Sequence, residues 1–317
     1  MVESQLFCLL ILKINKGRAK GSTNDKMRNF QGGEIKTLKG HNSDVNSVAF
    51  SPDGNIIASA STDSTIKLWN LQGEEIKTLL GHEGSVWSVA FSPNSTIITA
   101  SWDSTIKLWD LQGNEINTIH NGYSSMVFSV VFSPDGKIIA SGHADGTVKL
   151  WNLQGYIIKT LEGHGSVVFN VAFSPDSKII ATASWDNTIK LWNLQTQEIK
   201  TLKGHTGSVW DVVFNYSGNI IATASYDKTI KLWNLQGHTI KTLEGHTNRV
   251  NSVAFSPDNN IASGSSDNTV KLWNLQGHLI KTLKGHYSDV NSIAFSPDGN
   301  TIASASTDST IKLWNNW

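Results

Sequence analysis

From residue 34 onward, short runs of apolar and polar residues recur in a constant order. The run "TIKLW" occurs five times and "TVKLW" twice, with tryptophans 40 to 42 residues apart. Runs of the "VAFSPD" and "IIASAS" types precede it, and a run of the "EIKTL" type follows the turn "NLQG". Isoleucine, valine and threonine dominate these runs, and β-branched side chains pack well on a pleated surface. The pattern predicts an all-β protein of seven units, each with four short antiparallel strands.

The alternation within single strands predicts how the sheets pack. Ile66 and Leu68 point to one face of the "TIKLW" strand, while Lys67 and Trp69 point to the other. Large side chains on both faces indicate a sheet held between two neighbouring sheets. The first strand of each unit breaks the alternation, and a β-bulge near Asn46 would restore it.

The two ends of the repeated region indicate how the stack of sheets closes. Residues 43–70 and 288–315 differ at only two of 28 positions, and the chain ends shortly after the third strand of the last unit. The repeats begin with an orphan fourth strand, "EIKTL" at 34–38. Because a closed ring leaves no terminal sheet exposed, we expect residues 34–38 to complete the last sheet.

The motifs "GH", "VAFSPDG" and "SASTDSTIKLWN" resemble the WD-repeat β-propeller family over residues 34–315. The Trp-Asp pair occurs at Trp109-Asp110, and asparagine follows the tryptophan in the other units. The resemblance implies a seven-bladed β-propeller with four-stranded antiparallel blades, the last of them closed by residues 34–38. The near-identical units are also similar to bacterial multi-repeat WD proteins, in which such propellers often accompany signalling domains.

Residues 1–33 lie outside the repeats. The apolar run at 6–12 is too short to span a bilayer, and residues 15–33 are polar and contain glycine, as in a linker. We interpret residues 1–33 as a poorly packed leader or linker before a propeller at 34–317. A weak export or anchoring signal is the alternative.

Composition narrows the class of function. Lys and Arg number 26, as do Asp and Glu, and this balance argues against a dedicated nucleic-acid binder. The single cysteine, Cys8, cannot form an internal disulfide, so nothing indicates an oxidised secreted protein. We therefore expect a cytoplasmic protein with no membrane span and no nucleic-acid partner.

A histidine, a hydroxyl residue, an aspartate and a tryptophan recur at fixed positions. The family resemblance implies that they form a structural hydrogen-bonded network in each blade, because buried polar groups without partners cost about 1–3 kcal/mol each. One active site does not need seven copies, so we expect no catalytic triad, metal or cofactor. A second serine row, which includes Ser61 and Ser101, is an alternative participant. The predicted network residues are His41, Ser59, Asp63, Trp69, His82, Thr99, Asp103, Trp109, Ser141, Asp145, Trp151, His164, Thr182, Asp186, Trp192, His205, Thr223, Asp227, Trp233, His246, Ser263, Asp267, Trp273, His286, Ser304, Asp308 and Trp314.

The third unit departs from this pattern. Tyr123 stands where histidine belongs, His143 replaces the serine two places before Asp145, and one residue is inserted near His120. We expect a rewired and locally weaker network there, in which His143 is a locally satisfied polar residue. A ligand-binding or pH-sensing His143 is the alternative.

The repeats diverge on one rim of the predicted ring. Antiparallel strands place the "SPDG" and "NLQG" turns on one rim and the "GH" and "STDS" loops on the other, where the copies differ. Units six, seven and one carry Arg249, Asp289, Asp44 and three asparagines there. Units two to five carry aromatic residues instead, namely Trp87, Trp102, Phe128, Phe169, Trp185, Trp210 and Tyr226.

Such an apolar half-rim is of the size that signals a binding site, and the alternative is packing in the channel or between blades. The leading hypothesis is a non-enzymatic scaffold that binds a protein or peptide. Asp44, Asp211 and Asp289 favour a partner with Lys or Arg, since cations also lie well over tryptophan faces. A lectin-like or small-ligand propeller is the runner-up, because sugars stack on aromatic rings. An enzyme ranks third, since the rim offers no matched acid–base or nucleophile–base pair.

Overall fold

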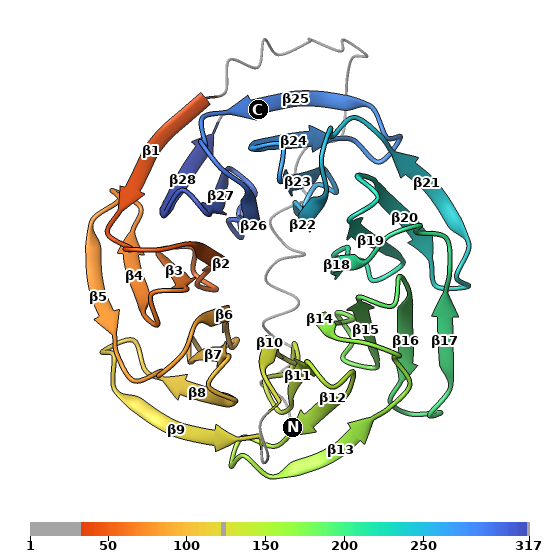
Figure 1. The fold of residues 1–317 in the computed structure, drawn as a ribbon, viewed down its shortest axis with the longest axis horizontal. Helices are drawn as coiled ribbons and strands as arrows, with labels where there is room; N and C mark the ends of the chain where they lie inside the picture. The colour runs from red at the N-terminus through yellow and green to blue at the C-terminus, as the bar shows by residue number, and fades with distance from the viewer. Residues whose placement is uncertain (1–32, 122–124, 316–317) are drawn as a thin grey trace, which may run out of the picture. The chain divides into compact units, whose positions relative to one another are not determined.

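The computed structural model describes residues 33–121 and 125–315, referred to below as the described residues. They form seven four-stranded antiparallel sheets arranged as a ring of blades (Figure 1). The predicted all-β, seven-bladed propeller is confirmed. Residues 1–32 and Tyr123 lie outside the described residues, so the leader at 1–33 stays a prediction.

Six blades are continuous in sequence. Blades 1 to 3 comprise β2 (Val45–Phe50), β3 (Ile56–Ser61), β4 (Ile66–Asn70), β5 (Glu75–Leu79), β6 (Val86–Phe91), β7 (Ile97–Ser101), β8 (Thr105–Trp109), β9 (Glu115–His120), β10 (Val127–Phe132), β11 (Ile139–His143), β12 (Val148–Trp151) and β13 (Ile157–Leu161). Blades 4 to 6 comprise β14 (Val168–Phe173), β15 (Ile179–Ser184), β16 (Ile189–Asn193), β17 (Ile199–Leu202), β18 (Val209–Phe214), β19 (Ile220–Ser225), β20 (Ile230–Asn234), β21 (Thr239–Leu243), β22 (Val250–Phe255), β23 (Ile261–Ser265), β24 (Thr269–Trp273) and β25 (Leu279–Lys284).

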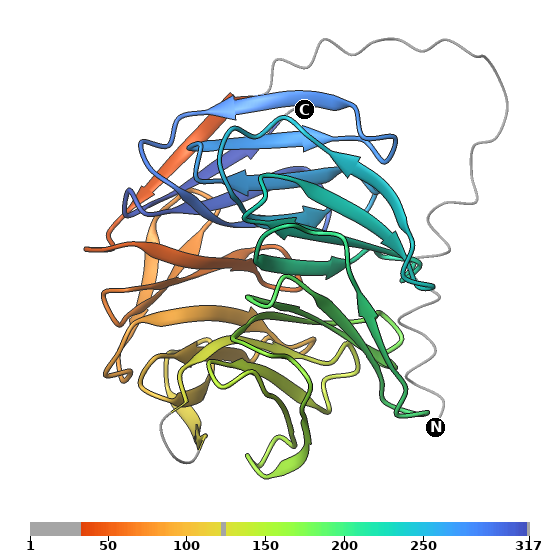
Figure 2. The same ribbon diagram turned by 45° about the vertical axis from the view of Figure 1, so that its right-hand side comes forward.

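The seventh blade joins the two ends of the repeated region. It comprises β26 (Val290–Phe295), β27 (Thr301–Ser306), β28 (Thr310–Asn315) and the N-terminal β1 (Gly33–Lys39). β1 pairs antiparallel with β28, with Leu38 opposite Ile311, and Figures 1 and 2 show the red β1 beside the blue last blade. Leu38 is fully buried with Ile311 and with Val45 of blade 1. The predicted closure by residues 34–38 is therefore confirmed, with one further residue at each end of the strand.

The first strand of every blade carries the expected bulge. In blade 1 Val45 lies opposite Ser61 and Ser47 lies opposite Ala60, which leaves Asn46 as the extra residue. The same register shift occurs in β6, β10, β14, β18, β22 and β26. These seven strands lie nearest the ring axis in Figure 1, so the bulges bring seven equivalent residues to the axial channel.

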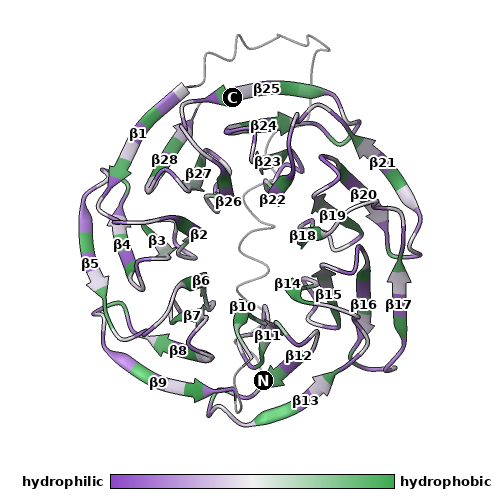
Figure 3. Ribbon diagram, viewed as in Figure 1, coloured by the Kyte–Doolittle hydropathy of each residue, from purple (hydrophilic) through white to green (hydrophobic). Residues whose placement is uncertain are grey.

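Apolar side chains fill the spaces between neighbouring blades. Trp69 and Val48 of blade 1 pack with Ala303 and Leu313 of blade 7, and each of the other clusters also joins two adjacent blades. Figure 3 shows hydrophobic positions on the strands of every blade. Each sheet is therefore packed on both faces, as the "TIKLW" pattern predicts. Among the described residues, no helix is long and apolar enough to cross a membrane.

Candidate functional site

The recurring polar residues form a chain of hydrogen bonds within a blade. In blade 4, Trp192 Nε1 donates to Thr182 Oγ1 at 2.9 Å, and this hydroxyl lies 2.7 Å from His164 Nε2. His164 Nδ1 lies 2.8 Å from Asp186 Oδ2. The carboxylate can only accept, so Nδ1 carries the proton of the neutral imidazole and Nε2 accepts from the hydroxyl. Every polar group along this chain therefore has a partner.

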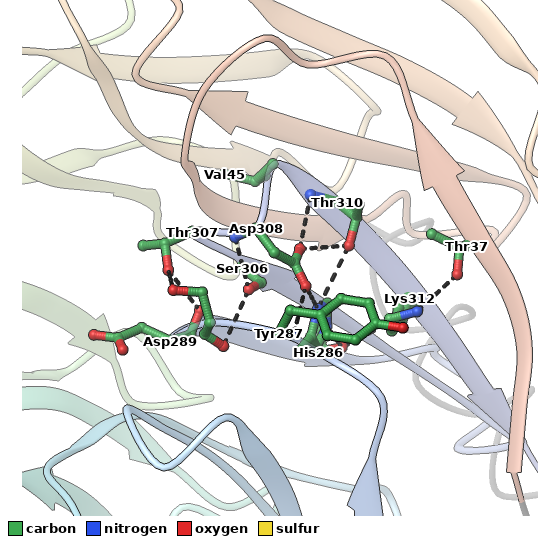
Figure 4. Close-up of polar contacts among 12 residues, drawn as sticks. Thr37, Val45, His286, Tyr287, Asp289, Ser306, Thr307, Asp308, Thr310 and Lys312 are labelled. Atoms are coloured by element: carbon green, nitrogen blue, oxygen red, sulfur yellow. Dashed lines mark hydrogen bonds and ion pairs between the residues drawn. The ribbon is translucent and has the colours of Figure 1, made fainter.

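The same geometry recurs in five other blades, and Figure 4 shows His286 beside Asp308 in blade 7. The tryptophan-to-hydroxyl distances of these blades are 2.8–3.0 Å. The serine of the second row serves a different purpose, since Ser61 Oγ accepts from Asp63 N within the hairpin. The other chains consist of His41, Ser59, Asp63 and Trp69; His82, Thr99, Asp103 and Trp109; His205, Thr223, Asp227 and Trp233; His246, Ser263, Asp267 and Trp273; and His286, Ser304, Asp308 and Trp314.

In these six blades the aspartate also connects the "GH" loop to the hairpin. Asp63 Oδ2 accepts from Asn42 N at 2.9 Å, and Asp63 Oδ1 accepts from Thr65 N and Thr65 Oγ1. Burial opposes ionisation of this carboxyl, but the hydrogen bonds from Thr65, Asn42 and His41 outweigh it and lower the pKa of Asp63 to about 2. The aspartates are therefore ionised structural acceptors, which is not the state of a general acid.

Blade 3 builds a different network. His143 is fully buried, and Asn121 Nδ2 donates to His143 Nδ1 at 2.9 Å while Asn121 Oδ1 accepts from Lys149 Nζ at 2.7 Å. His143 Nε2 then carries the proton and donates to Ser141 Oγ at 2.7 Å, which also accepts from Trp151 Nε1. The imidazole tautomer is therefore the reverse of that in the other blades.

Asp145 does not join the Ser141–Trp151 chain, which differs from the expected network. Its Oδ1 accepts from Thr147 within its own hairpin, and Asn121 lies where the other blades hold a histidine–aspartate contact. Sequence reasoning missed Asn121, although the residue lies at the one-residue insertion next to His120, which is a visible signal. Tyr123, the residue expected to replace the histidine, lies outside the described residues.

Replacement of His143 by serine is expected to make the free energy of unfolding depend less on pH below about pH 6.5. Burial, aided by the charge of Lys149, lowers the pKa of His143 to about 3, so the folded protein keeps it neutral while the unfolded chain protonates it below about pH 6.5. Stability is therefore lost as the pH falls from 6.5 toward 3, by about 1.4 kcal/mol per pH unit from this residue alone. Denaturant unfolding of wild type and H143S between pH 7.5 and 4.5 measures the difference, and parallel profiles would contradict the assignment.

The aromatic residues of the variable rim gather into one contiguous cluster. Trp87, Phe128, Phe169 and Trp210, called here the inner row, occupy the bulge positions of blades 2 to 5. Trp87 and Phe128 have ring centroids 5.3 Å apart, Phe128 and Phe169 5.4 Å, and Phe169 stacks on Trp210 at 4.1 Å. The inner row thus forms a continuous aromatic wall on one side of the channel.

A second, more exposed set of rings lies above this wall. Trp102 stacks on Trp87 at 5.0 Å, and Trp185 lies 5.8 Å from Phe169. Trp102 is 40% exposed, and Trp185 and Tyr226 are each 57% exposed. The structure therefore brings six of the predicted aromatic residues together, while Tyr226 makes no ring contact with another described residue. The inner row packs in the channel and the outer rings face solvent, and a binding role for either set stays a prediction.

Asparagine at the same bulge position has a structural task. Asn46 Nδ2 donates to Val86 O of the next blade at 3.0 Å, and Asn251 and Asn291 make equivalent bonds to Val290 O and Val45 O. Phe128 and Phe169 have no side-chain donor for this contact, and the indole N–H groups of Trp87 and Trp210 do not make it. In addition, Nε1 of Trp87 and of Trp210 has no hydrogen-bond partner within the described part of the chain. Blades 2 to 5, which carry the inner row, therefore lack the inter-blade hydrogen bond that asparagine makes in blades 1, 6 and 7.

The charged residues opposite the aromatic wall are partly paired. Arg249 Nη2 lies 3.0 Å from Asp289 Oδ2, and the guanidinium lies 5.2 Å from the centroid of Trp210. The negative charge of Asp289 is therefore already matched within the protein. The carboxylate of Asp44 makes no hydrogen bond or ion pair with other described residues, and Asp44 lines the channel mouth.

The inner row and the asparagines surround a cavity of about 340 Å³ at the axis. The residues that follow the bulges lie deeper in its wall, namely Ser47, Ser88, Ser129, Asn170, Asp211, Ser252 and Ser292. Sequence reasoning placed Asp211 with the charges of the rim, but its side chain is buried in the channel wall. Within the described ranges, no group of three or more His, Cys, Asp or Glu residues could hold a metal ion.

Seven four-stranded sheets closed into a ring define a β-propeller, and the repeated histidine-to-tryptophan chain is the feature that the WD-repeat resemblance implied. A family model described as IFT122 first beta-propeller matches residues 25–274, and one described as WD domain, G-beta repeat matches residues 277–315. The chain belongs to the WD-repeat β-propeller family. Propellers of this family generally act as scaffolds that bind proteins. No curated protein matches the chain, and the similarity to bacterial multi-repeat proteins stays a prediction.

Proposed function

We propose that this propeller is a non-enzymatic scaffold that binds a protein or peptide segment on its aromatic half-rim. The observation that carries the proposal is the exchange at the bulge positions, where blades 2 to 5 hold aromatic rings in place of the bonding asparagines. Phenylalanine at two of these positions shows that a carbon ring satisfies the local packing. Trp87 and Trp210 keep buried indole N–H groups without partners, at a cost of about 1–3 kcal/mol each. A role in binding explains why blades 2 to 5 carry aromatic residues at positions where the fold accepts asparagine.

The surface favours an extended partner with apolar and cationic side chains. Tryptophan and tyrosine are enriched among residues that dominate interface affinity, and cations bind favourably over tryptophan faces. Asp44 adds a free negative charge at the channel mouth, whereas Arg249 and Asp289 neutralise each other. The proposal includes a cytoplasmic location, in keeping with a chain whose single cysteine cannot form an internal disulfide.

The double substitution W87N/W210N is expected to weaken binding of peptides selected on the wild-type protein by about 30-fold or more. Each tryptophan of an interface centre contributes about 2 kcal/mol or more, and one such residue corresponds to about 30-fold in affinity. Asparagine is the matched substitute, because Asn46, Asn251 and Asn291 occupy the same position and bond to the next blade. Peptides from a displayed random library would be measured by titration against both proteins.

The control variant W87F/W210F keeps an aromatic ring at both positions and should retain most of the affinity. Thermal melting of all three proteins should agree within a few degrees. Unchanged peptide affinity in W87N/W210N would refute the proposal. A marked decrease in the melting temperature of this variant would indicate that both tryptophans have a purely structural role. A glycan array probed in parallel tests the lectin-like alternative, which selective sugar binding without peptide binding would support.

A further inference from the structure

Asp211 occupies the position after the bulge, where five of the other blades carry a serine. Ser47 Oγ accepts from Val89 N of the next blade at 3.2 Å, and the serines of blades 2, 3, 6 and 7 make the same inter-blade bond. In blade 5, Asp211 Oδ2 accepts from Val253 N at 2.9 Å. A hydroxyl is therefore sufficient for this contact, and the carboxylate adds a charge that the ring does not need.

That charge has no counter-ion in the described part of the protein. Asp211 is only 7% exposed, and its carboxylate accepts hydrogen bonds from the Val253 and Val212 amides and from the Ser252 hydroxyl. Arg249, a cationic residue that lines the same cavity, pairs with Asp289 and lies against Trp210. Burial raises the pKa of Asp211 to about 6, which reflects the unfavourable placement of a charge without a partner.

The cavity next to Asp211 combines this carboxylate with an aromatic wall. Its volume of about 340 Å³ is at the lower end of the range for small-ligand sites. Trp87, Phe128, Phe169 and Trp210 form one side, and Asp44 lies at the mouth. Aromatic faces attract cations and pack against aliphatic stems, while a buried carboxylate binds an ammonium or guanidinium group strongly.

We propose that this cavity receives one Lys or Arg side chain of the bound peptide, and that Asp211 selects for its positive charge. The aliphatic stem lies along the inner row, and the cationic head replaces the missing counter-ion of Asp211. This inference rests on the proposed function, since it identifies which partner group enters the channel. On this account Asp211 selects for a positively charged side chain, and the aromatic half-rim provides most of the binding free energy.

The test uses three capped pentapeptides, Gly-Gly-X-Gly-Gly with X as arginine, lysine or the uncharged norleucine, titrated into the full chain at pH 7.5. The indole N–H signals of the tryptophans in ¹H–¹⁵N spectra report binding. Wild type is expected to bind the better cationic peptide at least about tenfold more tightly than the norleucine peptide, the preference typical of a charge-assisted hydrogen bond. In D211S most of this preference should be lost, because only Asp44 and the aromatic faces remain to attract a cation, while the norleucine affinity is not reduced.

D211S also separates selectivity from folding. Serine supplies the Val253 contact as in the other blades, and it removes a buried charge, so its melting temperature should equal or exceed that of wild type. A preference for the cationic peptides that is undiminished in D211S, or its absence in wild type, would overturn the inference. Equally tight binding of free butylammonium would overturn the assignment to a peptide side chain. The library experiment with W87N/W210N decides the proposed function independently of these outcomes.

Discussion

A chain that begins at residue 40 is expected to melt about 10 °C or more below a chain that begins at residue 32. The shorter chain lacks β1, whose Leu38 is fully buried between blades 7 and 1. Loss of such a leucine costs about 2–5 kcal/mol, and each kcal/mol corresponds to about 2–4 °C for a domain of this size class. The Lys312 Nζ bonds to Glu34 Oε2 and Thr37 Oγ1, both at 2.8 Å, are lost as well.

Differential scanning calorimetry of the two chains measures this effect. A synthetic peptide of residues 33–39 added to the shorter chain should restore part of the melting temperature, because β1 is attached to blade 7 by non-covalent contacts. The exposed edge of β28 should also make the shorter chain prone to aggregation. Equal melting temperatures would show that the ring does not depend on closure by β1.

The substitution Thr182→Val is expected to destabilise the propeller by about 2–5 kcal/mol. Valine keeps the shape of threonine but leaves Trp192 Nε1 and His164 Nε2 without a partner in a buried site. Each unsatisfied buried group costs about 1–3 kcal/mol. Urea unfolding followed by tryptophan fluorescence gives the free energy of unfolding for wild type and T182V.

Thr160→Val is the matched control, because Thr160 lies exposed on β13 and exposed substitutions usually change stability by less than about 0.5 kcal/mol. A loss in T182V no larger than in T160V would show that the hydrogen-bonded chain adds little to stability. Such a result would also remove the structural reason for the repeated histidine, hydroxyl and aspartate positions.

Much of the fold is readable from the sequence because its signals are local and repeated. The alternation in "TIKLW" indicates a strand packed on both faces, and "EIKTL" at 34–38 indicates the closing strand. Val45 and Val48 are three residues apart and cannot share a face of a regular strand, which indicates the bulge at Asn46. Comparison of equivalent positions also identifies the aromatic residues of the variable rim. Each of these inferences needs only the two-residue period of a strand and the spacing of the repeats.

Several side-chain contacts, between blades and within blade 3, could not be predicted in this way. The bond from Asn46 to Val86 O, the pairing of Arg249 with Asp289 over Trp210, and the contact of Asn121 with His143 join residues that the strand period does not relate. They depend on rotamers, loop conformations and distances across the ring. The sequence shows Asp211 as one acidic residue among several, and only burial in the channel wall distinguishes it.

By itself, the sequence determined the number of blades, the order of their strands, the closing strand and the positions at which the blades differ, since a repeated local pattern encodes all of these. Tertiary structure alone decided which of the differing residues meet. The bulges turn side chains from seven separate blades toward one axis, and there an aromatic wall, a neutralised ion pair and the buried carboxylate of Asp211 surround one cavity, with Asp44 at its mouth. Burial and proximity in space, which no strand period specifies, give those residues their chemistry.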